Sequence, residues 1–434
     1  MRPDTLNPGR SVGPNTLTAG KIRRLVDGNC GIDIRRVTQP DQNRHTARLQ
    51  LRFNTDPLPD VDRLRDLTLE LVEVESPTGD TAGVARLYAR RLAEIGMDVE
   101  LLDERFPRTP IVVGRLRGGR QGPTIVLNGH LDTVPIPHES PRVEGQTIHG
   151  RGSADMKGAL ACAAEVARVL AERGSFPGEL VIVAIGLHEA PGGRGEDLNW
   201  LLNEAGFTAD YAVVCELAGD SFCAAHMGSA TVTVEVSRPG MPTHELQTPP
   251  GTPHPLMAAG KVIAAVEARN AELAETEYPW VGAETYFLGE LHGGDFYNRF
   301  PTTCRLVGTR RWPPGRTLAE VEEEYRALLA PIAKETGCTI ELDLRLVRDS
   351  YRIDPDDKLA VALREAYHEV TGNEQPLIGM KVVADGAVFH QAGIATVYHG
   401  PTGTGAHADV ESIQVPELVR ATKVYLALLE RLWA

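Results

Sequence analysis

The sequence predicts an α/β protein: a mostly parallel, doubly wound sheet with helices on both faces, interrupted by a smaller α+β unit. From about residue 57, amphipathic helical segments alternate with short runs rich in β-branched residues, which is typical of parallel sheets. Residues 227–347 change to the order β-α-β-β-α-β, the pattern of a split ferredoxin-like unit. The first pattern resumes at residue 348, so the smaller unit is inserted into the larger one.

The larger unit begins with two segments of helical periodicity, 62–74 and 81–96, and Gly96 is expected to end the second. The following segments alternate between the two types of secondary structure. We expect strands at 98–104, 109–116, 123–129, 179–187 and 210–216, and helices at 157–174 and 358–372. The remaining C-terminal residues read as short strands and a final helix.

The inserted unit has longer strand-like segments separated by glycine-rich turns. We expect its strands at 229–237, 284–294, 303–312 and 338–347, and its helices at 254–273 and 318–337. The predicted domains are therefore 57–226 joined with 348–434, and 227–347 as the insertion.

Residues 1–56 form a separate N-terminal extension with ten Lys or Arg and five Asp or Glu residues. Residues 42–54, QNRHTARLQLRFN, alternate in character and predict a strand, so we expect partial order in this extension. Its sequence indicates no function.

The composition excludes several classes of function. A net charge of -14 argues against a nucleic-acid partner, because such proteins present a basic surface. The six cysteines form no CxxC pair, which indicates reduced thiols in a cytoplasmic protein. There is no signal-peptide pattern and no apolar run of about 18 residues, so we expect no membrane association.

Histidine and acidic residues follow the predicted strands where each strand ends. In an open parallel sheet, binding sites lie at the carboxyl ends of the strands. The residues are His130 and Asp132 in GHLDTVP, Asp155 in GRGSADMKG, Glu189 and Glu216 after the next strands, and His407 in GTGAHADVE. Taken alone, each of the others is more often an ordinary polar residue, and Asp155 is equally well explained as a helix N-cap. Together they predict a metal site, in which Asp132 would hold the second nitrogen of His130.

In this order, the motifs resemble those of the aminoacylase, carboxypeptidase G and succinyl-diaminopimelate desuccinylase family of metallohydrolases, over about residues 57–434. The resemblance implies a zinc-exopeptidase-like fold with an inserted lid and dimerisation domain. It implies that His130 and Glu216 bind one metal ion and that Asp155 bridges to a second. It further implies that Asp132 is the partner of His130, that Glu189 is the general base and that His407 binds the second ion.

The resemblance extends to the inserted domain. The segment 240-GMPTH-244 resembles a motif whose histidine, His244 here, acts in the partner subunit's site, and 298-NRFP-301 places Asn298 in a similar role. RRWPPG resembles the arginine motif that binds the substrate carboxylate; its register favours Arg311, with Arg310 as the alternative. A homodimer or higher homo-oligomer and a small carboxylate-bearing substrate are therefore expected.

The stretch 186-GLHEAPGGRG-195 departs from the family pattern of two adjacent acids followed by one residue and a glycine. Counting back from Gly192 places Glu189 at the base and Ala190 at the ligand of the second ion. The alternative makes Glu189 the ligand and His188 the base, but it needs an insertion. Because alanine cannot bind a metal, we expect one Mn²⁺ or Zn²⁺ ion per subunit, an empty second site, and a His407 free to bind substrate or developing charge.

These features predict a hydrolase that cleaves a C–N bond by attack of metal-bound water. One atypical member of the family removes the amino group of a nitroaromatic acid, 5-nitroanthranilate, and this is a specific alternative. A non-catalytic small-molecule binding protein is a second alternative, against which the retained Glu189 argues. The chain has no GxSxG and no GxGxxG after a strand, so serine-hydrolase and dinucleotide-binding functions are not expected.

Overall fold

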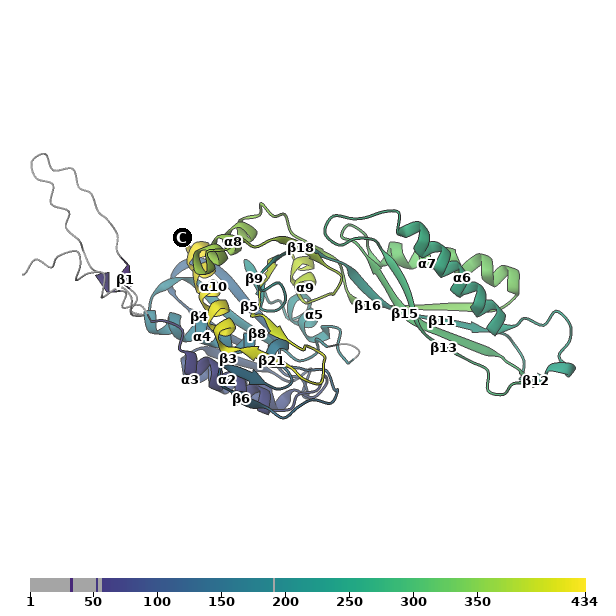
Figure 1. Ribbon diagram of the computed structural model, residues 1–434, viewed down its shortest axis with the longest axis horizontal. Coiled ribbons are helices and arrows are strands. Elements are labelled where there is room, and N and C mark those ends of the chain that lie inside the picture. The colour runs from purple at the N-terminus through teal and green to yellow at the C-terminus, as the bar shows by residue number, and fades with distance from the viewer. Residues whose placement is uncertain (1–31, 34–51, 54–56, 190–191) are drawn as a thin grey trace, which may run out of the picture. The chain divides into compact units, whose positions relative to one another are not determined.

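The computed structural model describes residues 57–189 and 192–434, together with residues 32–33 and 52–53 (Figure 1). The chain divides into two units, Met1–Pro57 and Leu58–Ala434. In the first unit, strands β1 (Ile32–Asp33) and β2 (Arg52–Phe53) pair antiparallel. Strand β2 lies within the predicted strand 42–54, whose other residues lie outside the described part of the chain.

The larger unit is built on a six-stranded sheet in the order β19-β9-β5-β8-β4-β3. Neighbouring strands from β19 to β8 are parallel, whereas β4 and β3 add an antiparallel edge, so the predicted mostly parallel sheet is confirmed. The strands are β3 (Asp98–Leu102), β4 (Ile111–Arg117), β5 (Gly119–His130), β8 (Phe176–Ile185), β9 (Tyr211–Val214) and β19 (Ala395–Tyr398).

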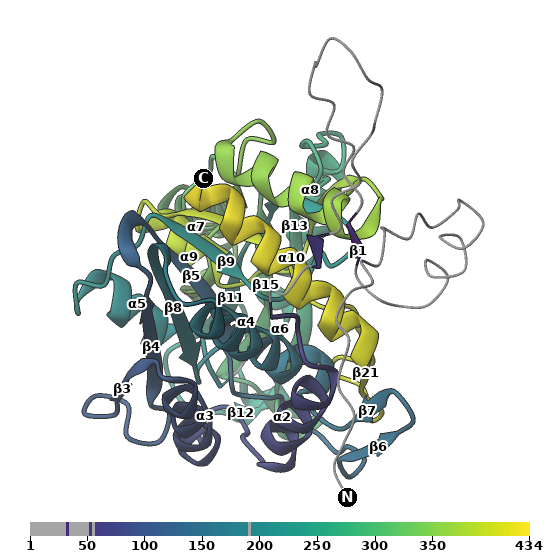
Figure 2. The ribbon, with the colours of Figure 1, turned by 90° about the vertical axis from the view of Figure 1, so that its left-hand side faces the viewer.

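Helices cover both faces of this sheet, as predicted: in Figure 1 the strands lie between α4 and α10 on one side and α5 and α9 on the other, and Figure 2 shows α4 and α10 from their outer side. Helix α4 is Ala-rich and buried along most of its length, because it packs between the sheet and α10. The helices are α2 (Val61–Glu73), α3 (Ala82–Ile95), α4 (Gly158–Arg173), α5 (Glu196–Asn203), α8 (Lys358–Thr371), α9 (Gly386–Gln391) and α10 (Val415–Trp433).

Short strands complete the larger unit, and the sequence did not predict most of them because two to five residues are too few to show a periodicity. One small sheet has the order β20-β21-β7-β6 and another the order β17-β10-β18. Their bounds are β6 (Arg142–Glu144), β7 (Thr147–His149), β10 (Phe222–His226), β17 (Tyr351–Arg352), β18 (Leu377–Met380), β20 (Gly403–Thr404) and β21 (Ser412–Gln414).

The inserted unit contains every element that the sequence predicted for it. Its antiparallel sheet has the order β13-β15-β11-β16, and the alternating valines of β11 pack beneath the two helices. The elements are β11 (Gly228–Ser237), α6 (Pro255–Leu273), β13 (Thr285–Gly293), β15 (Thr303–Trp312), α7 (Leu318–Thr336) and β16 (Thr339–Arg348), with β12 (Thr243–His244) and β14 (Arg299–Phe300) forming a separate pair. The domain boundaries at 226/227 and 347/348 remain a prediction. In the described residues, no helix is long and apolar enough to cross a membrane.

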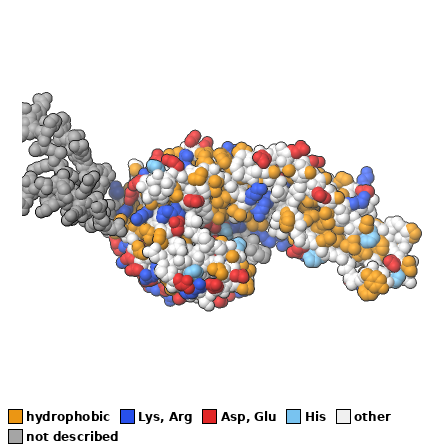
Figure 3. Space-filling model, viewed as in Figure 1, with side chains coloured by type: hydrophobic (Ala, Val, Ile, Leu, Met, Phe, Trp, Pro, Cys, Tyr) orange, Lys and Arg blue, Asp and Glu red, His pale blue; other side chains and the backbone are white. Residues whose placement is uncertain are grey.

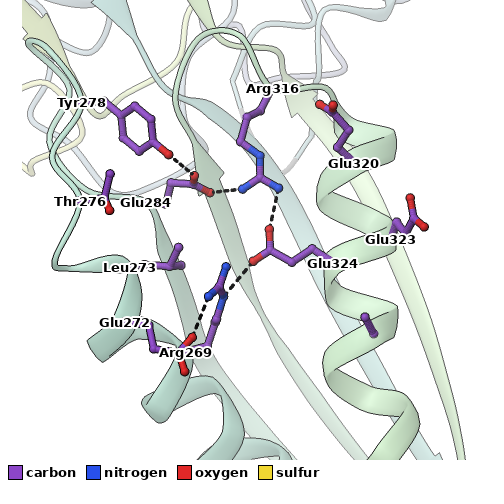
Figure 4. Close-up of a pocket in the computed structure, with 11 residues that line it drawn as sticks. Arg269, Glu272, Leu273, Thr276, Tyr278, Glu284, Arg316, Glu320, Glu323 and Glu324 are labelled. Atoms are coloured by element: carbon purple, nitrogen blue, oxygen red, sulfur yellow. Dashed lines mark hydrogen bonds and ion pairs between the residues drawn. The ribbon is translucent and has the colours of Figure 1, made fainter.

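An ion-pair network is buried beside the inserted sheet. The fully buried guanidinium of Arg310 contacts Glu284 and lies 3.5 Å from a carboxylate oxygen of Glu324. Arg316 donates to both carboxylates, at 2.7 and 2.6 Å. Glu284, Arg316 and Glu324 line a cavity of about 660 Å³, in which the two carboxylates already have arginine partners (Figure 4). The cavity contains no histidine, and its paired charges indicate a structural role.

We expect the substitution Arg310→Met to lower the free energy of unfolding by about 3 kcal/mol, because removing one partner of a buried ion pair leaves a charge poorly compensated. Urea unfolding measures the loss. Arg326→Met is the control, since Arg326 pairs with Glu322 in solvent with 63% of its side chain exposed, and such pairs contribute at most about 1 kcal/mol. Equal effects of the two substitutions would contradict a stabilising role for the network.

Candidate active site

The carboxyl ends of three neighbouring parallel strands meet at one edge of the large sheet. Strands β9 and β8 flank β5, and His130, the last residue of β5, is in register with Ile185 of β8. Glu189 follows β8 and Glu216 follows β9, so both acids lie beside His130. The loops after β7 and β20 add Asp155 and His407. The structure thus brings together five of the residues that the sequence singled out.

His130, Asp155 and Glu216 form a compact donor set. The Nε2 atom of His130 is 3.2 Å from Oδ1 of Asp155 and 3.7 Å from Oε2 of Glu216. Burial alone lowers the pKa of His130, but its hydrogen bond to Asp155 and the nearby carboxylate of Glu216 raise that pKa well above the usual value. The second oxygen of Glu216 is buried and has no hydrogen-bond partner among the described residues. An imidazole facing two carboxylates, one of them unsatisfied, fits a divalent cation.

Asp132 lies behind His130, but it holds the imidazole differently from the prediction. Nδ1–H of His130 donates to the main-chain carbonyl of Asp132 at 2.9 Å, whereas the carboxylate is 3.6 Å away. That carboxylate instead accepts hydrogen bonds from the backbone N–H groups of His188 and Glu189, at 3.2 and 2.8 Å. Asp132 therefore fixes both the tautomer of His130 and the loop that carries Glu189.

Glu189 and His407 face each other across the site. Nε2 of His407 is 3.1 Å from Oε1 of Glu189 and 3.4 Å from Oδ2 of Asp155. Burial raises the pKa of Glu189, and the hydrogen bond to Asp155 raises the pKa of His407 to about 9. His407 also has a φ of 61°, a left-handed conformation that is uncommon for residues other than glycine. Ala190, on which the one-metal prediction depends, lies outside the described residues.

Comparison with known proteins identifies this arrangement. Residues 126–431 match the model of peptidase family M20/M25/M40. The chain belongs to this family. Its members are divalent-metal-dependent hydrolases, and the chain is a metallopeptidase-like hydrolase acting on C–N bonds.

Two curated relatives of this M20 protein match along nearly their whole length. An N-formyl-4-amino-5-aminomethyl-2-methylpyrimidine deformylase from Bacillus subtilis is 26% identical over 81% of this chain and 89% of its own. A succinyl-diaminopimelate desuccinylase from Thioalkalivibrio sulfidiphilus is 25% identical over 85% of this chain and 98% of its own. By their names, the first removes a formyl group and the second a succinyl group.

Two solved structures show the same fold at low sequence identity. The aminopeptidase PepT from Bacillus cereus superposes with a TM-score of 0.71 and 21% identity, over 86% of this chain and 99% of its own. A dinuclear metal-binding peptidase of the M20 family from Bacillus subtilis gives a TM-score of 0.64 and 17% identity, over 85% and 97%. The predicted fold class is thereby confirmed.

Glu411 is a residue of this M20 site to which the sequence gave no role. One of its carboxylate oxygens accepts the backbone N–H groups of Gly152, Ala154 and Asp155, at 2.9 to 3.0 Å. Its other oxygen pairs with the buried Arg151 at 2.7 Å. Gly152 has a φ of 87°, which a glycine adopts without strain. Glu411 therefore fixes the loop that presents Asp155, and its place at the end of GTGAHADVE, four residues after His407, was the available signal.

We expect the substitution Glu411→Gln to weaken divalent-metal affinity about 10- to 100-fold, the usual cost of losing a residue that orients a metal ligand. The amide would leave the buried Arg151 without its anion and the loop of Asp155 less well fixed. Calorimetric titration with Mn²⁺ measures the affinity. Glu417→Gln, which removes a partly exposed ion pair with Arg420 on α10, serves as the matched control, and an equal affinity in both variants would contradict this role.

His188 also enters the site, although the sequence considered it only as an alternative base. Its ring stacks on that of His130, with centroids 4.1 Å apart and an interplanar angle of 2°. Its Nδ1–H donates to Asp385 at 2.7 Å, and Asp385 is paired with Arg348. Asp385 and Arg348 are 197 and 160 positions away in the sequence, so no local pattern could have indicated the contact.

The two candidate arginines differ in their surroundings. Arg310 is engaged by Glu284 within the inserted domain. Arg311 lies next to it on β15, where its guanidinium donates to the carbonyl of Lys381, and burial lowers its pKa. Its contacts among the described residues include no carboxylate, which leaves Arg311 the better candidate for binding a substrate carboxylate.

His244 and Asn298 come together on the small β12–β14 pair. Nδ2 of Asn298 is 3.1 Å from Nε2 of His244; His244 is exposed and Asn298 is half-buried. Neither makes a hydrogen bond or ion pair with the described residues around His130. The structure therefore joins these two residues to each other, but not to the donor residues around His130 in their own chain.

Proposed function

We propose that this M20 protein cleaves a C–N bond in a small carboxylate-bearing substrate, using one Mn²⁺ or Zn²⁺ ion held by His130, Asp155 and Glu216. The observation that supports this proposal is that the carboxylates of Asp155 and Glu216 both lie within 3.7 Å of Nε2 of His130, with Glu189 close to His130 and Asp155. A bound divalent ion lowers the pKa of its water to about 7 and thereby supplies hydroxide.

Residues of the chain then transfer the proton of the attacking water. Glu189 is buried next to the donor set, and its raised pKa brings it closer to the range in which a carboxylate exchanges protons at neutral pH. It accepts the proton of the attacking water and returns it to the leaving nitrogen. His407, 3.1 Å from Glu189, is placed to stabilise negative charge that develops on the substrate. A non-catalytic binding protein would not need this base.

The substrate class follows from Arg311 and from the relatives. Arg311 has no acidic partner among the contacts described, so it binds the substrate carboxylate. Because one relative is a deformylase and another a desuccinylase, an N-acyl group on an amino acid is the first choice of substrate. Removal of the amino group from 5-nitroanthranilate is the second choice, since one ion suffices to supply hydroxide.

The active unit is a homodimer or a higher homo-oligomer in which His244 and Asn298 complete the partner subunit's site. Figure 3 shows hydrophobic side chains over the end of the inserted domain where β12 lies. Around His244 and Asn298, the side chains of Met241, Leu246, Phe296 and Tyr297 are 61–89% exposed. Exposed apolar side chains gathered around two functional polar residues favour a protein–protein contact.

The first experiment is metal analysis of protein purified without chelator, followed by assays of the same preparation. About one ion per subunit, with hydrolysis of N-formyl or N-succinyl amino acids, supports the proposal. Turnover of 5-nitroanthranilate in place of these amides selects the second substrate. About two ions per subunit would refute the one-ion site, and a lack of both metal and turnover would refute the proposed function.

A further inference from the structure

The two ring nitrogens of His188 have different surroundings: Nδ1 is hydrogen-bonded to Asp385, and Nε2 faces the candidate site. Nδ1–H donates to Asp385 Oδ2 at 2.7 Å, while Nε2 lies 4.0 Å from Oε2 of Glu216. The backbone N–H of His188 is held by the Asp132 carboxylate. Only 12% of the side chain is exposed, so the imidazole is held in place, and its Nε2 faces Glu216 beside His130.

Asp385 and Arg348 hold His188 in this orientation. The Asp385 carboxylate accepts two hydrogen bonds from the Arg348 guanidinium, at 2.6 and 3.0 Å, and both side chains are almost fully buried. An ionised, paired carboxylate can only accept, so it fixes the proton of His188 on Nδ1. A Cβ atom at Gly195 would be 2.8 Å from the guanidinium carbon, so the backbone of the loop after Glu189 also packs closely on Arg348.

The stacking of His188 on His130 bears on whether His188 binds the metal ion or the substrate. A ring nitrogen directs its lone pair within the plane of its own ring. His130, His188 and Glu216 each offer a ligand atom within 4.8 Å of the other two, but the ring planes are parallel with centroids 4.1 Å apart, so an ion in the plane of one ring lies outside the plane of the other. Since His130 already belongs to the proposed donor set, we assign His188 to the substrate that binds beside the ion.

We propose that Nε2 of His188 hydrogen-bonds a polar atom of the substrate next to the bond that is cleaved, and that Asp385 and Arg348 are its positioning residues. This inference rests on the proposed function, because it requires a substrate group at the His130 site. It adds to that function a contact from within the same chain, whereas His244 is expected to act from the partner subunit.

The test uses the full chain loaded with Mn²⁺ and acetohydroxamate as the probe, a small metal-binding compound with an N–H beside its oxygens. Two substitutions distinguish the contributions of the two ring nitrogens of His188. His188→Asn keeps an amide near Nδ1, where it can still meet Asp385, but removes Nε2. His188→Gln extends an amide towards the position of Nε2. His368→Asn, at an exposed histidine of α8, is the control.

We expect His188→Asn to bind acetohydroxamate about tenfold more weakly, the size of one hydrogen bond to a charged or strongly polar group, with unchanged metal content and melting temperature. His188→Gln should retain more of the affinity, Asp385→Asn should lose an intermediate amount, and the control should match the wild type. Unchanged probe affinity in His188→Asn would overturn the contact, and loss of metal from it would make His188 a ligand instead. A wild-type protein that binds no metal would refute the proposed function rather than this inference.

Discussion

In a Glu189→Gln variant we expect turnover to fall by roughly a hundredfold to ten-thousandfold, the range that general acid–base catalysis contributes. The amide cannot take a proton from water or return one to the leaving nitrogen. Because Glu189 lies outside the proposed donor set of His130, Asp155 and Glu216, the bound metal should remain at the wild-type level. Steady-state kinetics and metal analysis of the same preparation measure both quantities.

A matched control is available in the helix that follows. Glu196→Gln, at the exposed start of α5, makes the same chemical change outside the site and should leave turnover within about twofold. A Glu189→Gln enzyme with wild-type turnover would refute the assignment of the base. Loss of the metal ion together with activity would instead indicate that Glu189 is a ligand, which is the alternative register considered for residues 188–190.

The long elements of the fold were predictable because each carries its own pattern. The six elements of the inserted domain all lie within a few residues of their predicted positions, and Gly96 ends α3 in the left-handed conformation that only glycine adopts easily. Elements such as β17, β18 and β20 have two to four residues, and they form because tertiary contacts place them, not because of a periodicity.

The candidate site was predictable where it depends on strand ends. Parallel strands bring their last residues to one edge, so His130, Glu189 and Glu216 could be placed together before any geometry was known. Contacts between loops that are distant in the sequence could not be predicted in this way. The hydrogen bond from His188 to Asp385 and the three backbone hydrogen bonds to Glu411 depend on how loops cross in space.

Asp132 shows the limit of reasoning from a motif. The spacing His-x-Asp correctly predicted that the two residues touch, but either the carboxylate or the carbonyl of the aspartate can reach Nδ1 of His130. In the structure the carbonyl does so, which leaves the carboxylate to accept the backbone N–H groups of the next loop. The motif thus acts on His130 and Glu189 together.

Restoring the missing acid should restore a second metal ion. We expect an Ala190→Glu variant to bind about two divalent ions per subunit where the wild type binds about one, because a third ligand would join Asp155 and His407. The nearest atoms of those two side chains are already only 3.4 Å apart. Three protein ligands are what a catalytic ion usually requires, and two hold an ion only weakly. Calorimetric titration with Zn²⁺ would show a second binding event.

Ala190→Gln is the control, since an amide of the same length is a much poorer ligand than a carboxylate and should leave one ion bound. If Ala190→Glu also gains activity on N-acyl amino acids, the wild-type site differs from its dinuclear relatives chiefly by this one ligand. If it gains metal but loses activity, the space beside Glu189 and His407 is used by the substrate itself, and the alanine is part of the specificity. A second ion already present in the wild type would require another donor near His407, with Glu189, 3.1 Å away, as the first to test.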